Sequence, residues 1–315
     1  MSTTTEVATI EDTRNGSNTQ HEAPAYKQKS AIEAISQGAT IAGIPSFTSM
    51  DKKRRWMLEH MAGAFRVFGR KGYAEGMSGH ISLRDPEHPD SFWTNPLGLH
   101  FSQVKVSDLI LLDSNGSAIG GNRSRPANAA GFQIHGAIHR MYPHVNAACH
   151  THSVNGKAWS TFAQPLEMIN QDSTMFYGEA QGLYPEFGGV VLDSAESVRL
   201  ARSLGPKGKL LILRNHGLLT AGQTVDEAAY LFTLAERSCE IQLKTEAAAA
   251  NGMKKMIIDK DAAEYTFKMT SDPVSFEVWS AKENIADIWD QEALYVEFQP
   301  DYELERELTN DAFLK

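Results

Sequence analysis

The sequence predicts an α/β protein, in which short buried strands alternate with amphipathic helices. Two observations carry this prediction. Apolar residues recur at helical spacing over residues 50–72 and again after residue 224. Between these segments lie several short apolar runs, bounded by Gly, Pro, Asn and Asp as strands commonly are.

The first half of the chain predicts one helix and three strands. The helix is expected to begin after Ser49, whose hydroxyl can cap it. Its apolar stripe recurs at helical spacing from Trp56 to Phe68. Strand-like runs follow at residues 79–84, 91–94 and 109–113, and residues 114–116 have the composition of a hairpin turn.

The second half predicts two helices and two strands. A helix fits residues 129–141, and the apolar run after it indicates a strand that ends at His150. Residues 210–214 form another apolar run, typical of a buried strand. Thr224 and Glu227 have the spacing of a capping box, which opens a long amphipathic helix. That helix is expected to end near residues 251–252.

The composition divides the chain into four parts. Residues 1–30 contain almost no apolar surface to bury and are expected to be disordered. Residues 31–48 form a connector, and residues 49–275 form the folded domain. Residues 276–315 mix aromatic and acidic residues, and we expect a C-terminal arm that packs on a neighbouring subunit or frays.

Charge and cysteine content exclude several classes of protein. The net charge of −9 argues against a nucleic-acid partner, whose phosphates require a basic surface. Two cysteines cannot form a disulfide framework, which favours a reducing compartment. No apolar run is long enough to cross a membrane, and no signal-peptide core is present. We therefore expect a cytoplasmic protein without a membrane partner.

Three histidines form the most informative pattern in the sequence. His150 and His152 are two residues apart at the end of a predicted strand, where their side chains would leave on the same face. His216 follows the apolar run at residues 210–214 and precedes a Gly-permitted turn. Three neutral imidazoles at two strand ends can bind one divalent cation and leave a position open for substrate. Zn²⁺ is the expected metal, and Fe²⁺ or Mn²⁺ would also suit these ligands.

Five motifs in order resemble one known family. The motifs are Gly79-x-x-Ser82-x-Arg84, Asn95-Pro96-x-Gly98, an Ala/Gly-rich helix start, His150-x-His152-Ser153 and Asn215-His216-Gly217, with a long helix after the last. Over about residues 52–252 this order resembles the class II aldolase/adducin N-terminal domain family. The resemblance implies a three-layer α/β/α sandwich with a mixed central sheet. It also implies a homotetramer with sites between subunits, and zinc held by the three histidines.

One departure from the family pattern bears on the substrate. Phosphosugar aldolases of the family carry Ser-Ser-Glu about nineteen residues before the first ligand histidine. Here that position reads Ala129-Ala130-Gly131, which offers neither hydroxyls for a phosphate nor a carboxylate for proton transfer. The family's Gly-Asn pair reads Gly79-His80. We therefore expect an unphosphorylated small-molecule substrate and place the chain in the adducin-like branch of the family.

Other groups must then supply the acid–base chemistry. His80 is the first candidate, although a plain turn would explain it equally well, and Tyr177, Glu179 and a metal-bound water follow. Glu186 is a further acidic residue that could replace the missing carboxylate. His135 is expected beneath the metal site as a hydrogen-bond partner, and His139 is expected to face solvent. The residues expected to contact substrate are Gly79, Asn95, Gly98, Asn128, Gly131, Gln171 and Asp172.

Three functions are consistent with these features. The first is a metal-dependent lyase that performs aldol, retro-aldol or decarboxylation chemistry, with the metal stabilising an enolate. The second is a non-haem iron oxygenase built on the same three histidines. The third is a non-catalytic adducin-like interaction protein, which the intact histidine set and the absence of a Lys-rich tail disfavour.

Overall fold

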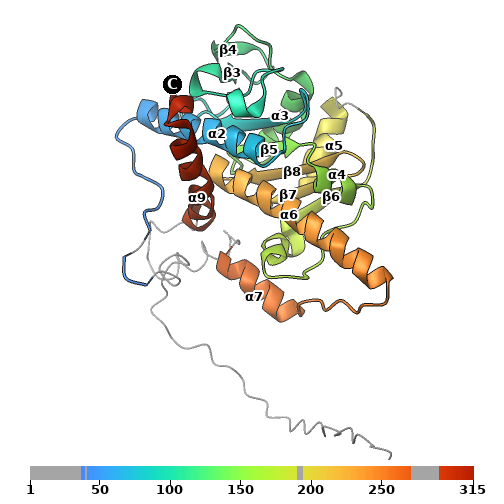
Figure 1. Cartoon of the computed structure of the whole chain (residues 1–315). Helices are drawn as coiled ribbons and strands as arrows, with labels where there is room; N and C mark the ends of the chain where they lie inside the picture. Colours follow the sequence, from blue (N-terminus) through green and yellow to red (C-terminus); the bar gives the residue numbers. More distant parts are fainter. Residues whose placement is uncertain (1–36, 40, 190–193, 271–290) are drawn as a thin grey trace, which may run out of the picture.

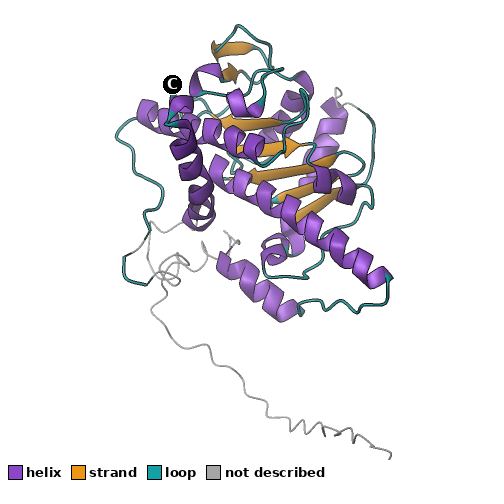
Figure 2. Ribbon diagram, viewed as in Figure 1, coloured by secondary structure: helices purple, strands orange, loops and turns teal. Residues whose placement is uncertain are grey.

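A mixed eight-stranded sheet forms the centre of the protein (Figures 1 and 2). The computed structural model describes residues 37–39, 41–189, 194–270 and 291–315. The strands are β1 (His80–Arg84), β2 (Phe92–Thr94), β3 (Ile110–Leu112), β4 (Ala118–Gly121), β5 (Ala147–Thr151), β6 (Gln181–Tyr184), β7 (Leu210–Leu213) and β8 (Gly217–Gly222). Their order is β4-β3-β2-β1-β5-β8-β7-β6, and only β6 and β7 pair in parallel.

Helices cover both faces of the sheet, so the fold has three layers (Figure 2). The helices are α2 (Met50–Arg70), α3 (Ala129–Met141), α4 (Val154–Ser160), α5 (Ser194–Leu204), α6 (Val225–Ala250), α7 (Lys260–Thr270) and α9 (Gln291–Thr309). α3 and α5 pack together on one face, and α2, α4 and α6 lie on the other. The three-layer α/β/α sandwich predicted from the sequence is confirmed.

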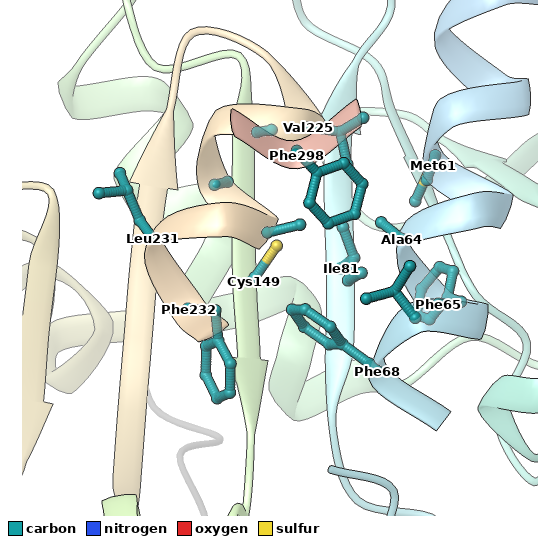
Figure 3. Packing of buried hydrophobic residues seen from close by; sticks show 14 of the residues in the cluster. Met61, Ala64, Phe65, Phe68, Ile81, Cys149, Val225, Leu231, Phe232 and Phe298 are labelled. Atoms are coloured by element: carbon teal, nitrogen blue, oxygen red, sulfur yellow. The ribbon is translucent and has the colours of Figure 1, made fainter. Parts of the chain in front are cut away.

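Two hydrophobic cores hold these layers together, one on each face of the sheet. The larger core joins α2 and α6 to β1 and β5, and it contains Phe65, Phe68 and Phe232 (Figure 3). Cys149 of β5 points into this core and is fully buried. Because side chains alternate along a strand, its neighbour His150 points to the α3 face.

The helix ends follow the capping residues identified in the sequence. The Ser49 hydroxyl accepts from the Lys52 backbone N–H, and α2 begins at the next residue. The Thr224 hydroxyl accepts from the Glu227 N–H at 3.0 Å, and α6 runs to the turn at residues 251–252. The elements that the sequence did not predict are β4, β6, β8, α4, α5, α7 and α9.

The last described residues pack against the rest of the same chain. α9 lies along α2 and α6, and its Leu294, Tyr295, Phe298 and Tyr302 are buried (Figure 1). This segment therefore contributes Leu294, Phe298, Tyr302 and Phe313 to the larger core, although the sequence assigned residues 276–315 to a separate arm. The predicted tail at residues 1–30 lies outside the described residues, and so does the predicted boundary at residue 275. No helix among the described residues is both long and apolar enough to span a membrane.

Candidate metal centre

Most of the candidate functional residues lie at one end of the central strands of the sheet. β5 ends there, β7 turns into β8 there, and the antiparallel β1 begins there with His80. The pairing places His80 directly opposite His150, so both side chains lie on the α3 face. The amino-terminal end of α3 covers this end of the strands, and its Gly131 lies against the His80 ring.

His150, His152 and His216 converge, as the sequence predicts. Their candidate ligand nitrogens all lie within 4.8 Å of one another. The Nε2 atoms of His152 and His216 are 3.0 Å apart. The ring of His150 lies 4.7 Å from that of His216 and 5.2 Å from that of His152, centroid to centroid. We call these three residues the histidine triad.

Hydrogen bonding fixes the ring of His150. Its Nδ1 lies 2.8 Å from the Leu218 carbonyl oxygen on β8, which can only accept, so Nδ1 carries the proton. The Nε2 atom is left without a proton and is free to bind a cation. Burial lowers the pKa of His150 well below its usual value, and the neighbouring histidines lower it further. The ring is therefore neutral, as a metal ligand must be.

His216 depends on an unusual backbone turn between β7 and β8. Asn215 has a φ of 57° and Gly217 a φ of 152°, so two residues beside His216 adopt left-handed conformations. Asn tolerates this region better than most residues, and Gly adopts it without strain. A side chain at position 217 would also lie 3.0 Å from the Thr151 carbonyl oxygen. This turn directs His216 toward His152, and burial lowers its pKa to about 4.

The segment after His152 is held by a buried carboxylate from α6. Glu236 accepts hydrogen bonds from the Ser153 hydroxyl at 2.5 Å and from the backbone N–H groups of Asn155 at 2.8 Å and Gly156 at 2.6 Å. These groups open α4, immediately after the triad. Glu236 therefore fixes the path of the chain beyond His152, a role that the sequence gave no reason to assign.

The triad suits a divalent cation. Two Nε2 atoms face each other, and the hydrogen bond to Leu218 leaves the third free. In a tetrahedral zinc site, ligand nitrogens lie about 3.3 Å apart, so a small opening of the 3.0 Å pair would admit the metal. Three ligands leave a fourth position for substrate or water.

His80 fills space that a side chain at position 131 would otherwise occupy. A Cβ added at Gly131 would lie 2.6 Å from Cδ2 and 2.7 Å from Cγ of His80. The His80 ring is 5.0 Å from the His150 ring, centroid to centroid, and is buried. His80 of β1 thus lies against position 131 of α3. By the family resemblance, this is the position of the carboxylate in phosphosugar aldolases.

Comparison with known proteins identifies the family. A model of the Class II Aldolase and Adducin N-terminal domain matches residues 59–243. The chain belongs to the class II aldolase/adducin family.

Relatives in this family carry different names. The chain is 45% identical to the meiotically up-regulated gene 14 protein of Schizosaccharomyces pombe, over 70% of this chain and 84% of that protein. Decarboxylase NovR of Streptomyces niveus is 40% identical, over 65% of this chain and 75% of the relative. The 4-hydroxy-3-prenylphenylpyruvate oxygenase/4-hydroxy-3-prenylbenzoate synthase of Streptomyces roseochromogenus subsp. oscitans is 38% identical, over 65% of this chain and 73% of that protein.

A solved structure shares most of the fold. L-fuculose 1-phosphate aldolase from Glaciozyma antarctica PI12 superposes with a TM-score of 0.74 and 35% sequence identity. The match covers 86% of this chain and 97% of that chain. The α/β/α fold predicted from the family resemblance is therefore found in a solved relative.

Several predicted substrate contacts lie at the same edge as the triad. Asn95 is buried just after β2, whose last residue, Thr94, pairs with Ser82 of β1. Gly98 follows in a turn with a φ of 78°. The Asn128 side chain caps α3 by accepting from the Gly131 N–H at 3.1 Å. This class II aldolase-like chain therefore places these residues around the His80 end of the sheet.

The other predicted site residues lie elsewhere. Gln171 and Asp172 are exposed at the start of the short helix η3 (Asp172–Phe176), and the Tyr177 ring lies 6.3 Å from Phe267 of α7. Glu179 is exposed, pairs with Lys207 at 3.0 Å and precedes β6 at the end of the sheet opposite the triad. Within one chain these residues do not join the triad, and their predicted role at a neighbouring subunit's site stays a prediction.

The prediction that His139 faces solvent is wrong. His139 is buried, its ring stacks on Phe92 at 4.5 Å, and burial lowers its pKa to about 3. It lies one helical turn after His135, and both residues face the sheet because α3 presents the same side to it at this spacing. His135 hydrogen-bonds to His80 rather than to a residue of the triad.

Charged residues near the site were missed from the sequence. Lys157 of α4 pairs with Glu75 at 2.5 Å, and both act electrostatically on His152. Arg123 and Arg125 line a hollow of about 600 Å³ beside Asn128 at the start of α3. These residues belong to loops or to another helix, so spacing along the chain could not place them.

The contact between Gly131 and His80 predicts a specific mutational coupling. Gly131→Ala should destabilise the protein by about 1–3 kcal/mol, because its new methyl group overlaps the His80 ring. In a His80→Ala background most of that cost should vanish. Urea unfolding at one protein concentration measures both effects. Gly136→Ala, on the same helix but facing flexible Arg140 and Phe132 atoms, is the control. Equal costs in the two backgrounds would contradict the contact.

Glu236 should tune metal affinity without binding the metal. Glu236→Gln loses one of the two oxygens that accept from Ser153, Asn155 and Gly156, so the chain beyond His152 should loosen. We expect zinc affinity to fall by about tenfold, measured by competition with a chelator. Glu240→Gln, one turn further along α6 and paired with exposed Lys244, is the matched control. Identical affinities in both variants would show that Glu236 has no such role.

Proposed function

We propose that this protein is a metal-dependent lyase that breaks or forms a carbon–carbon bond in a small, unphosphorylated, oxygenated substrate. The observation that carries the proposal is the convergence of His150, His152 and His216, with a neutral His80 beside them. Aldol cleavage and decarboxylation both generate an enolate, so both need a site that holds a carbonyl oxygen and a group that moves a proton. The name of decarboxylase NovR supports this class of reaction.

The chain's own residues have separate roles in this proposal. The triad would hold the divalent cation, which when bound supplies Lewis-acid polarisation of a substrate carbonyl. His80 is the nearest candidate for proton transfer, since it contacts His150 across the β1–β5 pair. Asn95 and Asn128 offer amide groups for substrate hydroxyl or carbonyl groups.

A second candidate function uses the same triad. The relative from Streptomyces roseochromogenus is named an oxygenase, and three histidines also suit Fe²⁺. A third, non-catalytic adducin-like role would not require a metal. Metal analysis of the protein purified without added salts separates the three functions: zinc supports the lyase, iron supports the oxygenase, and no metal supports the interaction protein.

Metal binding should require each residue of the triad. The wild-type protein should hold one divalent cation per chain, with His150, His152 and His216 nitrogens at about 2.0–2.2 Å from it. His152→Ala removes one of three ligands and should abolish stoichiometric binding, measured by elemental analysis and X-ray absorption. His144→Ala, an exposed histidine before β5, should keep the metal. A full complement of metal in His152→Ala would refute the assignment.

Phosphorylated sugars should be poor substrates. Ala129, Ala130 and Gly131 offer no hydroxyl or carboxylate at the start of α3, so we expect no turnover of L-fuculose 1-phosphate or ribulose 5-phosphate in a coupled assay. A panel of unphosphorylated 2-oxo and 4-hydroxy-2-oxo acids is tested beside them. Phosphosugar cleavage that is lost in Arg125→Ala but kept in Arg140→Ala would instead assign phosphate binding to the loop arginines.

We also propose that the protein is a homotetramer. Gln171 and Asp172 are exposed, and the half-buried Tyr177 lies beside Phe267 of α7, so a neighbouring subunit's site would explain the role that the sequence assigns to these residues. Light scattering should give about four times the chain mass of 34.7 kDa. A fully active monomer would remove the proposed role of these three residues.

A further inference from the structure

A continuous chain of hydrogen bonds runs from His80 into the protein interior. The Nδ1 atom of His80 lies 2.9 Å from Nε2 of His135. Nδ1 of His135 lies 2.7 Å from the Ser82 hydroxyl, which lies 2.7 Å from Nε2 of His139. Nδ1 of His139 lies 3.0 Å from the Val145 carbonyl oxygen. Both linking histidines and the serine are buried, and we call Ser82, His135 and His139 the ordering chain.

The Val145 carbonyl oxygen, at the far end of the ordering chain, determines which ring nitrogen of each histidine in the chain carries the proton. The Val145 carbonyl can only accept, so His139 must carry its proton on Nδ1, and its Nε2 must accept from the Ser82 hydroxyl. The Ser82 oxygen then accepts from Nδ1 of His135. Nε2 of His135 is left as an acceptor, so the Nδ1–H group of His80 donates a hydrogen bond to it. The Nε2 atom of His80 therefore has a lone pair and no proton.

That lone pair lies beside Gly131 of α3, where an added Cβ would come within 2.9 Å of Nε2. No described residue forms a hydrogen bond with Nε2 of His80, and His80 interacts electrostatically with His152 and His216. His80 is not part of the group whose nitrogens lie within 4.8 Å of one another. It therefore stands beside the triad as a separate group, at the position left open by Gly131.

We propose that Ser82, His135 and His139 are positioning residues that hold His80 in its Nδ1–H form, so that its bare Nε2 faces the metal centre as a base. The inference rests on the proposed lyase function for its chemical meaning. Beyond that function, it names the residues that set the tautomer and the orientation of the base. Neither the triad nor family membership determines these two properties. A base whose tautomer is fixed in advance needs no reorganisation when substrate binds.

The ordering chain fixes the tautomer of His80 rather than carrying protons away from it. At its far end, the Arg84 guanidinium donates to the carbonyl oxygens of His139 at 2.7 Å and Val145 at 3.0 Å. A proton moving inward would create a second positive charge beside this cation, in a buried environment. A proton that His80 removes from substrate therefore stays on Nε2 until it returns to the reacting molecule.

This arrangement favours a reaction that begins with removal of a proton. In retro-aldol cleavage, His80 would take the proton of the β-hydroxyl group as the carbon–carbon bond breaks to an aldehyde and an enolate. The same proton then passes from Nε2 to the enolate carbon, so one base serves both steps and no other reactant is needed. Decarboxylation to an enolate begins instead with loss of CO₂ and then needs a donor for the carbon that lost it, and the Nδ1–H form has no proton at Nε2 to give.

The tautomer can be observed directly. Nitrogen-15 labelling of the histidines in the full-length, zinc-loaded protein distinguishes protonated from bare ring nitrogens by NMR, and the His80→Gln spectrum assigns the His80 signals. We expect a bare Nε2 and a protonated Nδ1 on His80 in the wild type. In Ser82→Ala, the constraint on His135 is lost, and a protonated Nε2 form of His80 should appear.

Matched variants separate this effect from general damage. Ser82→Thr keeps the hydroxyl and should keep the wild-type signals. Thr220→Val deletes another fully buried sheet hydroxyl, bonded to the Ala228 carbonyl on the opposite face, and should also leave them unchanged. A protonated Nε2 in the wild type, or an unchanged His80 in Ser82→Ala, would overturn the proposal. Failure to bind zinc would overturn the lyase function alone, because the spectra of the metal-free protein still decide the tautomer.

Discussion

The register between β1, β5 and β8 is the constraint on which the site depends. It sets His80 opposite His150 and His150 opposite Leu219, and it places Ser82 on the same face as both histidines. A slip of one residue would turn His150 into the α2–α6 core and Cys149 out of it. The dense apolar packing around Cys149 therefore also holds the triad together, since any register that exposed Cys149 would move His150 away from His152 and His216.

The second constraint is that four histidines are buried and, in the described part of the chain, have no carboxylate beside them to stabilise a charged ring. His80, His135, His139 and His150 are all buried, and among the described residues no carboxylate hydrogen-bonds to any of them. Burial lowers the pKa of each, and nearby histidines or cations lower it further. Neutral rings can then satisfy one another only in a fixed donor–acceptor order. The same property makes the rings suitable as metal ligands and makes their tautomers predictable.

The sequence could predict the triad but not the residues that surround it and hold it in place. His150, His152 and His216 are recognisable because strand periodicity and a following Gly place them at strand ends. Glu236 comes from the middle of α6, where nothing in its neighbours distinguishes it from a surface glutamate. His139 looked solvent-facing because helical spacing gives which residues share a face, and packing decides which face is buried. Glu75 and Lys157 approach His152 only through the tertiary fold.

In the function that we propose, His80 takes the place of the helix carboxylate that phosphosugar aldolases carry at the position of Gly131. A side chain at Gly131 and a histidine at position 80 compete for one volume, since the added Cβ would approach within 2.6 Å of the ring. A chain with glycine at 131 can therefore place a base there from β1, across the sheet edge from the triad. Because that base is neutral, it adds no negative charge beside the metal. A three-histidine site with a neutral base keeps the full charge of a divalent cation, which strengthens its attraction for an anionic oxygen such as that of an enolate.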